Sequence, residues 1–128
     1  MNQSKSSYRL RGPVQLAGTV RLAGSANAGL AAMCATLLTD ETVVLKNMPH
    51  ISDVATLSEL LQHFGAKIVK TDKNTISITC NAIKKTSAPA YLMSANRASF
   101  QVTGPLLARY GKVSPPPPGG DPIGGRPV

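Results

Sequence analysis

Apolar residues recur along the chain with two different periods, and together these predict an alternation of strands and helices. Short runs that alternate apolar and polar residues, rich in Val, Ile and Thr, are typical of strands. Longer runs with apolar residues three and four positions apart are typical of helices. The expected strands are 8–11, 19–23, 42–47, 67–70 and 75–79, and the expected helices are 28–38, 53–64 and 90–103.

Local signals fix several of the expected boundaries. Asn27, or Ser25 if the helix starts earlier, is a candidate cap for helix 28–38. Ser52 is the expected cap of helix 53–64, and Gly65 suits the position that follows its last turn. Gly104-Pro105 is expected to end or kink the third helix. A helical turn at 106–110 and a brief strand at 112–114 are expected after it.

The order of these elements defines the fold class. From residue 19 to residue 80 the order is strand, helix, strand, helix, strand, strand, which predicts a compact α/β unit. A second unit begins near residue 88 and stops in mid-pattern at residue 128, so we expect a truncated chain. Residues 114–127 are so rich in Pro and Gly that neither a helix nor a central strand is expected there.

Charge and composition narrow the possible partners. The net charge of +8 suits an anionic small molecule or a nucleic acid. The basic residues are dispersed, with no run longer than two and no interleaved aromatic residues, so a nucleic-acid module is the weaker hypothesis. Cys34 and Cys80 suggest neither a disulfide framework nor a metal site. No signal peptide or membrane span is evident, and the cytoplasm is the expected location.

Three segments could carry chemistry, and each also has an ordinary structural explanation. The turn at 22–28 joins a strand to a helix start, where free N–H groups favour an anion, although it could be a common turn with a cap. Arg97 would need an anionic partner if buried, and could equally be exposed on a helix. The Gly/Pro stretch at 119–128 could be a loop that closes over a substrate, or a disordered tail.

Five segments, in order, resemble one family. They are GSANAGL at 24–30, MPHISDV at 48–54, LLQHFGAKI at 60–68, NRASFQVTGPLLARYG at 96–111 and GGDPIGGRPV at 119–128. Together they resemble the enolpyruvyl transferases that act on UDP-N-acetylglucosamine, the UDP-N-acetylglucosamine 1-carboxyvinyltransferases. The shikimate-type enolpyruvyl transferases differ in the first and fourth motifs and rank below.

The resemblance implies a fold, an activity and two substrates. The fold is an inside-out α/β barrel of βαβαββ units in two domains. Residues 1–18 would be a strand of the other domain, and 19–128 an incomplete domain with a full unit at 19–80 and a partial unit at 88–128 holding a catalytic loop at 114–126. The reaction would transfer the enolpyruvyl group of phosphoenolpyruvate to the 3-hydroxyl of UDP-N-acetylglucosamine and release phosphate. This is the first committed step of peptidoglycan precursor synthesis.

The resemblance also implies roles for individual residues. Asn27 would help bind phosphoenolpyruvate, and Arg97 would contact a substrate phosphate or carboxylate. Arg126 would bind anionic groups of both substrates and, with Pro127 and Val128, would begin the UDP-sugar site. Asp121 stands where the family usually has a cysteine that donates a proton, which predicts resistance to the epoxide fosfomycin. No cofactor and no metal are expected, nor a nucleic-acid or membrane partner.

Two departures from the family pattern bear on activity. Ala26 replaces a lysine that supplies positive charge to phosphoenolpyruvate, and the prolines at 115–118 would stiffen a loop that must close. We expect the 128 residues alone, without the missing C-terminal part of the fold, to be inactive. A degenerate, non-catalytic relative that binds nucleotide-sugar weakly remains the alternative.

Overall fold

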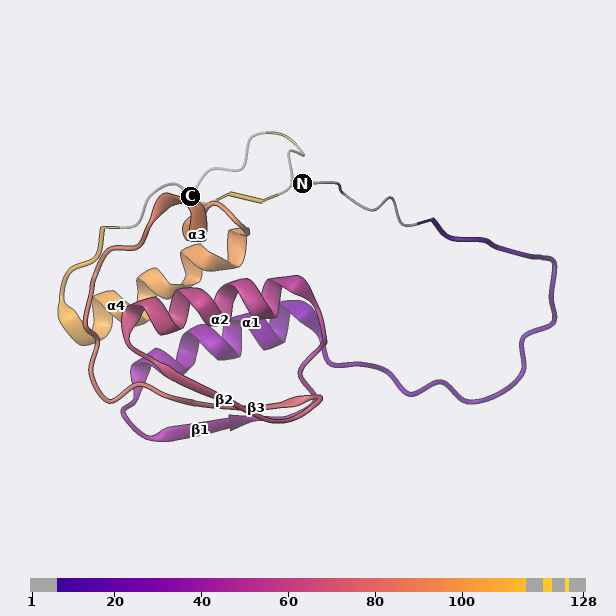
Figure 1. The fold of residues 1–128 in the computed structure, drawn as a ribbon, viewed down its shortest axis with the longest axis horizontal. Coiled ribbons are helices and arrows are strands. Elements are labelled where there is room, and N and C mark those ends of the chain that lie inside the picture. Colours follow the sequence, from indigo (N-terminus) through magenta and orange to yellow (C-terminus); the bar gives the residue numbers. More distant parts are fainter. Residues whose placement is uncertain (1–6, 115–118, 121–123, 125–128) are drawn as a thin grey trace.

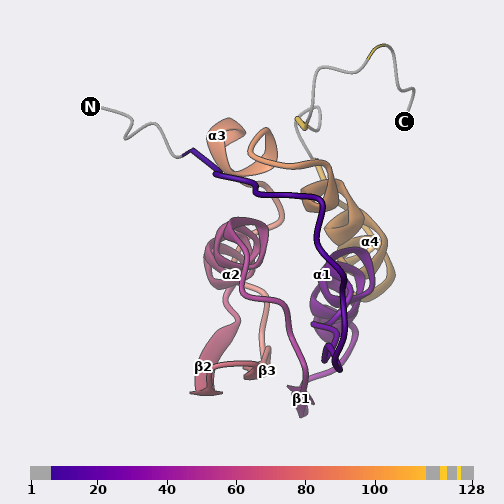
Figure 2. The same ribbon diagram turned by 90° about the vertical axis from the view of Figure 1, so that its right-hand side faces the viewer.

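The computed structural model of the chain describes residues 7–114, 119–120 and 124. A small sheet lies against one layer of helices, and a second helical layer packs on the far side of the first (Figures 1 and 2). This architecture confirms the α/β class. The elements in order are α1 (Ala26–Ala35), η1 (Thr36–Leu38), β1 (Thr42–Leu45), α2 (Ser52–Phe64), β2 (Lys67–Asp72), β3 (Thr75–Thr79), α3 (Ala90–Met93), η2 (Arg97–Val102) and α4 (Thr103–Tyr110).

The sheet has three antiparallel strands in the order β1-β3-β2. Ile78 in the central strand pairs with Val43 on one side and with Ile68 on the other. The expected hairpin of β2 and β3 is confirmed, and its turn is stabilised by a hydrogen bond of 2.8 Å from the Asn74 amide to Asp72 Oδ1. The apolar side chains that alternate along β3 therefore face the helices, as the sequence pattern predicts.

The core forms where α1, α2, β3 and the C-terminal helices meet. The apolar stripe of α2 is buried, and the helix ends at Gly65, whose φ of 113° is accessible to glycine at low cost. Cys34 of α1 belongs to this core and is only 2% exposed. The fully buried side chains include Met33, Leu37, Leu57, Leu60, Leu61, Phe64, Ile78, Met93, Val102 and Leu106.

Of the helix caps expected from the sequence, Ser25 is confirmed, whereas Asn27 and Ser52 are not caps. Helix α1 begins at Ala26, and its cap is Ser25, whose hydroxyl accepts a hydrogen bond of 3.3 Å from the Ala28 amide. Asn27 lies within the first turn and is not the cap. Ser52 is likewise the first residue of α2 and not its cap, because Ile51 occupies that position without a side-chain hydrogen bond.

The prediction of a single helix at 90–103 is wrong, because this segment forms two separate helical pieces. Helix α3 ends at Met93, and Asn96 starts a new helical run by accepting a hydrogen bond of 2.9 Å from the Ser99 amide. The run passes from the 3-10 helix η2 directly into α4. Pro105 lies in the first turn of α4, where a backbone N–H group would have no partner within the α-helix, so the N–H group that proline lacks is not missed. Gly111 follows α4 with a positive φ of 69°.

The expected strands at 8–11, 19–23 and 112–114 are not formed. A strand requires a ladder of hydrogen bonds to a neighbouring segment. Within the described part of the chain, 8–11 and 19–23 have no such ladder, and 112–114 makes a single hydrogen bond of 3.4 Å, from the Ser114 amide to the Thr86 carbonyl oxygen. Residues 7–23 instead follow an extended, exposed path that loops away from the body (Figure 1). The described unit therefore lacks the first strand of the expected βαβαββ order. Most apolar side chains of the segment 7–23 lie in water: Tyr8, Leu10, Leu16, Val20 and Leu22 are 83–94% exposed.

Candidate functional site

The turn before α1 forms one wall of a cavity of about 330 Å³. Gly24 approaches the end of β1 so closely that a methyl group at its Cα would lie 1.7 Å from the Asn47 carbonyl oxygen. Only glycine permits this contact, which holds the turn against the segment after β1. The cavity is lined by Ser25 and Ala28 on one side and by Lys46 on the other. Lys46 is therefore one of the residues that surround the predicted anion-binding turn.

Asn27 occupies the second position of α1 and is exposed. It does not line the cavity beside Lys46, nor the hollow described below. Its side chain is nevertheless on the first turn of a ten-residue helix, where the backbone N–H groups carry partial positive charge. A ligand with a phosphate or carboxylate could meet both the amide of Asn27 and this helix end.

Arg97 is the first residue of η2 and is half-buried. The backbone on either side of it is held in place by Asn96 and Ser99. The hydroxyl of Ser99, which is 1% exposed, donates to the carbonyl oxygens of Asn96 and Met93. These hydrogen bonds fix the direction in which the arginine leaves the helix.

The segment that contains Gly119 and Gly120 lies directly against Arg97. The Gly119 amide donates a hydrogen bond of 3.4 Å to the Met93 carbonyl oxygen, which also accepts from Ser99. A methyl group at Gly120 would lie 3.4 Å from Cβ of Arg97. The structure thus brings the predicted loop segment and the predicted anion-binding arginine together.

The remaining predicted site residues cannot be joined to this arrangement. Asp121, Arg126, Pro127 and Val128 lie outside the described residues. Figure 1 shows that α1, α2 and the run from η2 into α4 begin at the same side of the molecule. Helix α1 and η2 also touch, since the Cys34 thiol lies 3.8 Å from the Ala98 carbonyl oxygen.

The two cysteines are unsuited to nucleophilic chemistry. Both are free and buried, and burial raises the pKa of the Cys34 thiol to about 12. Burial also raises the pKa of the Cys80 thiol, against the opposing influence of the Arg109 charge.

Among residues 7–114, 119–120 and 124, no three His, Cys, Asp or Glu side chains gather as metal ligands would. Over the same residues, no helix has the length and apolar character needed to cross a bilayer.

Sequence reasoning missed Lys46, Asn96 and Ser99. The sequence places Lys46 inside the expected strand 42–47 as one of many dispersed basic residues, and only the structure, in which β1 ends at Leu45, shows that it lies beside the turn before α1. Asn96 and Ser99 carry a recognisable pattern, an Asn followed three residues later by a partner in a new helical turn.

A family model described as EPSP synthase (3-phosphoshikimate 1-carboxyvinyltransferase) matches residues 10–128. The chain therefore belongs to the EPSP synthase family of enolpyruvyl transferases, and its named relatives confirm the resemblance found in the sequence. Within it, the chain is 46% identical over 119 residues to the UDP-N-acetylglucosamine 1-carboxyvinyltransferase of Magnetococcus marinus. It is 44% identical over 117 residues to the protein of the same name in Coxiella burnetii.

A solved structure supports the fold. The enolpyruvyl transferase NikO from Streptomyces tendae matches with a TM-score of 0.67 and 25% sequence identity, over 75% of this chain and 22% of that one. The matches to the Magnetococcus and Coxiella proteins cover 93% and 91% of this chain but only 28% and 27% of those relatives. The chain thus spans about a quarter of the length of the proteins it matches.

Proposed function

We propose that this chain forms part of a UDP-N-acetylglucosamine 1-carboxyvinyltransferase. The reaction moves the enolpyruvyl group of phosphoenolpyruvate to the 3-hydroxyl of UDP-N-acetylglucosamine, releases phosphate and begins peptidoglycan precursor synthesis. In a whole enzyme, residues 19–128 would belong to one domain and 1–18 to its companion, with the substrates held between the two. The 128 residues alone are expected to be inactive.

The observation that carries this proposal is the contact between Arg97 and Gly120 at the start of the loop. Both substrates are polyanions, so an arginine whose Cβ packs against a loop that closes over them would bind and orient a phosphate or carboxylate through its guanidinium. The names and the 44–46% identity of the relatives support the choice of substrates. Asn27 would contact phosphoenolpyruvate from the first turn of α1.

Lys46 offers a replacement for the charge that Ala26 lacks. Lys46 is one of the residues that line the cavity beside the turn before Ala26. An ammonium group there would neutralise a phosphate bound at the start of α1 much as a lysine at position 26 would. We therefore assign Lys46 to the phosphoenolpyruvate site.

The chemistry at the vinyl carbon needs a proton donor, and we assign this role to Asp121. A carboxylic acid can donate a proton near neutral pH if a closed, dry site raises its pKa. Arg126, Pro127 and Val128 would then begin the UDP-sugar site. A carboxylic acid lacks the soft thiolate that an epoxide alkylates, so fosfomycin should leave this enzyme active.

A chimera tests the proposal, because it supplies the length that this chain does not span. The matching segment of the Magnetococcus relative is replaced by residues 10–128, and phosphate release is measured with both substrates, with each alone, and with fosfomycin. We expect release only with both substrates. Arg97→Ala should reduce kcat/KM by about 10- to 100-fold, as expected for loss of a charged hydrogen bond.

The role of Lys46 is tested in the same chimera. Lys46→Gln should raise KM for phosphoenolpyruvate, and adding Ala26→Lys to that variant should restore it. If both the chimera and its Ala26→Lys variant release no phosphate while the parent relative does, the chain is not part of a working transferase.

The alternative is a non-catalytic relative that only binds nucleotide-sugar, and Ala26 is the observation that favours it. Isothermal titration of the same chimera with UDP-N-acetylglucosamine separates the two. Binding without phosphate release, also in the Ala26→Lys variant, would support the alternative.

A further inference from the structure

A second hollow lies between the β2–β3 hairpin and the start of α2, and Asn27, Lys46 and Arg97 are not among the residues that line it. Its volume is about 360 Å³, within the range of small-molecule sites. Its floor is apolar and belongs to the core, since Met48, Val54 and Ile76 are 4–7% exposed. A ligand that reached this floor would remove apolar surface from water.

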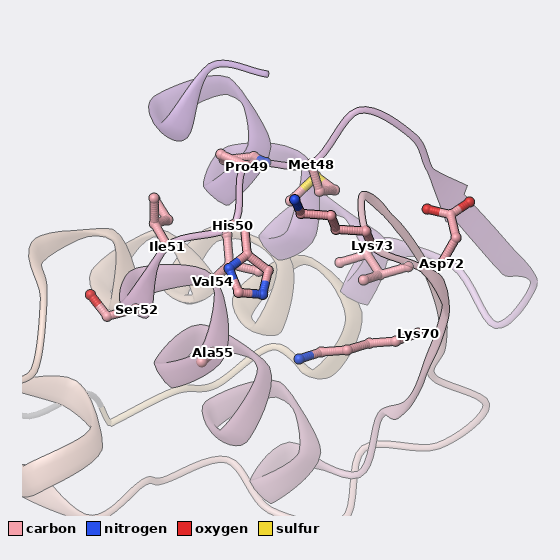
Figure 3. A pocket seen from close by; sticks show the side chains of 11 residues that line it. Met48, Pro49, His50, Ile51, Ser52, Val54, Ala55, Lys70, Asp72 and Lys73 are labelled. Atoms are coloured by element: carbon pink, nitrogen blue, oxygen red, sulfur yellow. The ribbon is translucent and has the colours of Figure 1, made fainter. Parts of the chain in front are cut away.

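Cationic and polar groups surround this floor. Figure 3 shows the Lys70 and Lys73 side chains extending from the hairpin toward His50 and α2, while the Asp72 carboxylate points away from them. Neither Lys70 nor Lys73 forms an ion pair with another residue of the described ranges. Asp72 accepts a hydrogen bond from the Asn74 amide, and this bond holds the pKa of its carboxyl below the usual value.

The walls of the hollow are tied together by the protein itself. Asn74 in the hairpin turn accepts a hydrogen bond of 2.8 Å from the Met48 amide through its backbone oxygen. Its side-chain amide returns a hydrogen bond of 2.7 Å to the Met48 carbonyl oxygen. The loop that bears His50 is therefore fixed to the strand ends that bear the two lysines. A site whose walls are fixed in this way loses little entropy when a ligand binds.

We propose that this hollow binds a small phosphomonoester with an apolar substituent. A phosphomonoester carries a charge of about −1.5 to −2 near pH 7, which matches two ammonium groups. Its oxygens can accept hydrogen bonds from Lys70, Lys73 and the His50 ring. The substituent then covers the floor at Val54 and Ile76. This site goes beyond the proposed transferase reaction and uses none of the residues assigned to it.

Titration of the 128-residue chain with phenyl phosphate, followed by amide nitrogen–proton NMR spectra, tests the proposal. We expect saturable shifts at residues 48–55 and 70–76. Lys70→Gln and Lys73→Gln should each weaken binding by about tenfold, as expected for loss of one charge-assisted contact. Lys67→Gln removes the same charge from the far end of the same strand and should leave the affinity unchanged.

Two further ligands and one further variant test the contributions of the charged and the apolar part of the ligand separately. Inorganic phosphate and benzoate should both bind more weakly than phenyl phosphate, because each lacks one half of the recognised chemistry. Ala55→Glu places a carboxylate at the rim of the hollow and should abolish binding, with the spectrum confirming an intact fold. Equal binding of inorganic and phenyl phosphate, or equal weakening by Lys67→Gln, overturns the proposal. This test is independent of phosphate release by the chimera.

Discussion

Arg109 joins three separate parts of the fold through one side chain. Its Nη1 group donates to the carbonyl oxygens of Leu37 at 2.9 Å, Thr39 at 3.1 Å and Cys80 at 3.0 Å. Leu37 lies in η1, Thr39 follows it, and Cys80 follows β3. Carbonyl groups at the ends of helices and strands have no ladder partner, so a cation from α4 satisfies them. Replacing Arg109 with Met keeps most of the apolar stem and removes the donor.

The expected loss in the free energy of unfolding follows from the number of N–H groups that Arg109 donates. One amino group has two N–H bonds to share among three carbonyl oxygens, so about two hydrogen bonds' worth of stabilisation is lost. A hydrogen bond from a charged group contributes about 1.5–3 kcal/mol, and partial exposure favours the lower end of this range. We therefore expect Arg109→Met to lower the free energy of unfolding by about 3 kcal/mol. Arg109→Lys should lose about half as much, because an ammonium lacks the planar fork.

Urea unfolding followed by circular dichroism measures both losses. Lys112→Met is the matched control, since Lys112 is an exposed cation just beyond α4 and should change stability by less than about 0.5 kcal/mol. A loss below about 1 kcal/mol for Arg109→Met, or one equal to that of the control, would refute the reasoning. It would show that water satisfies these carbonyl groups equally well.

Two further predictions concern burial and backbone conformation. Burial raises the pKa of the Cys34 thiol from 9.0 to about 12, so its contribution to stability is complete below pH 9 and is lost as pH rises toward 12. Between pH 8 and pH 10, urea unfolding should show about 1.4 kcal/mol more loss for the wild type than for Cys34→Ala. Gly65→Ala should cost about 1–3 kcal/mol in the same assay, because φ is 113° and the new methyl would lie 2.7 Å from the Ala82 carbonyl oxygen. Gly104→Ala, which meets nothing within 4 Å, should be neutral or slightly stabilising.

Elements that depend on neighbouring residues were predicted well from the sequence. The hairpin of β2 and β3 follows from alternation on either side of a turn that Asp72 and Asn74 stabilise. Helix α2 ends where Gly65 permits the left-handed conformation. In both cases the residues that determine the structure are close together in the sequence. Local pattern therefore carries enough information.

The break between α3 and η2 shows where such reasoning fails. The composition of 90–103 suits one helix, but Ser94 and Asn96 offer side chains that compete for backbone groups. Asn96 caps the new run, and the Ser99 hydroxyl takes the Met93 carbonyl oxygen. The choice between one helix and two depends on burial of Ser99 against the rest of the fold. A sum of the helix propensities of single residues contains no information about that burial.

The missing strands and the second hollow have a common physical cause, which is that both depend on neighbours distant in the sequence. Residues 19–23 alternate as a strand does, yet alternation supplies no hydrogen-bonded partner, and 7–23 leaves its apolar side chains in water. Lys70 and Lys73 read as dispersed surface charge until the fold brings His50 beside them. A sequence pattern predicts which face of an element is apolar. It does not predict which other element will meet that face, and both pairing and binding are decided there.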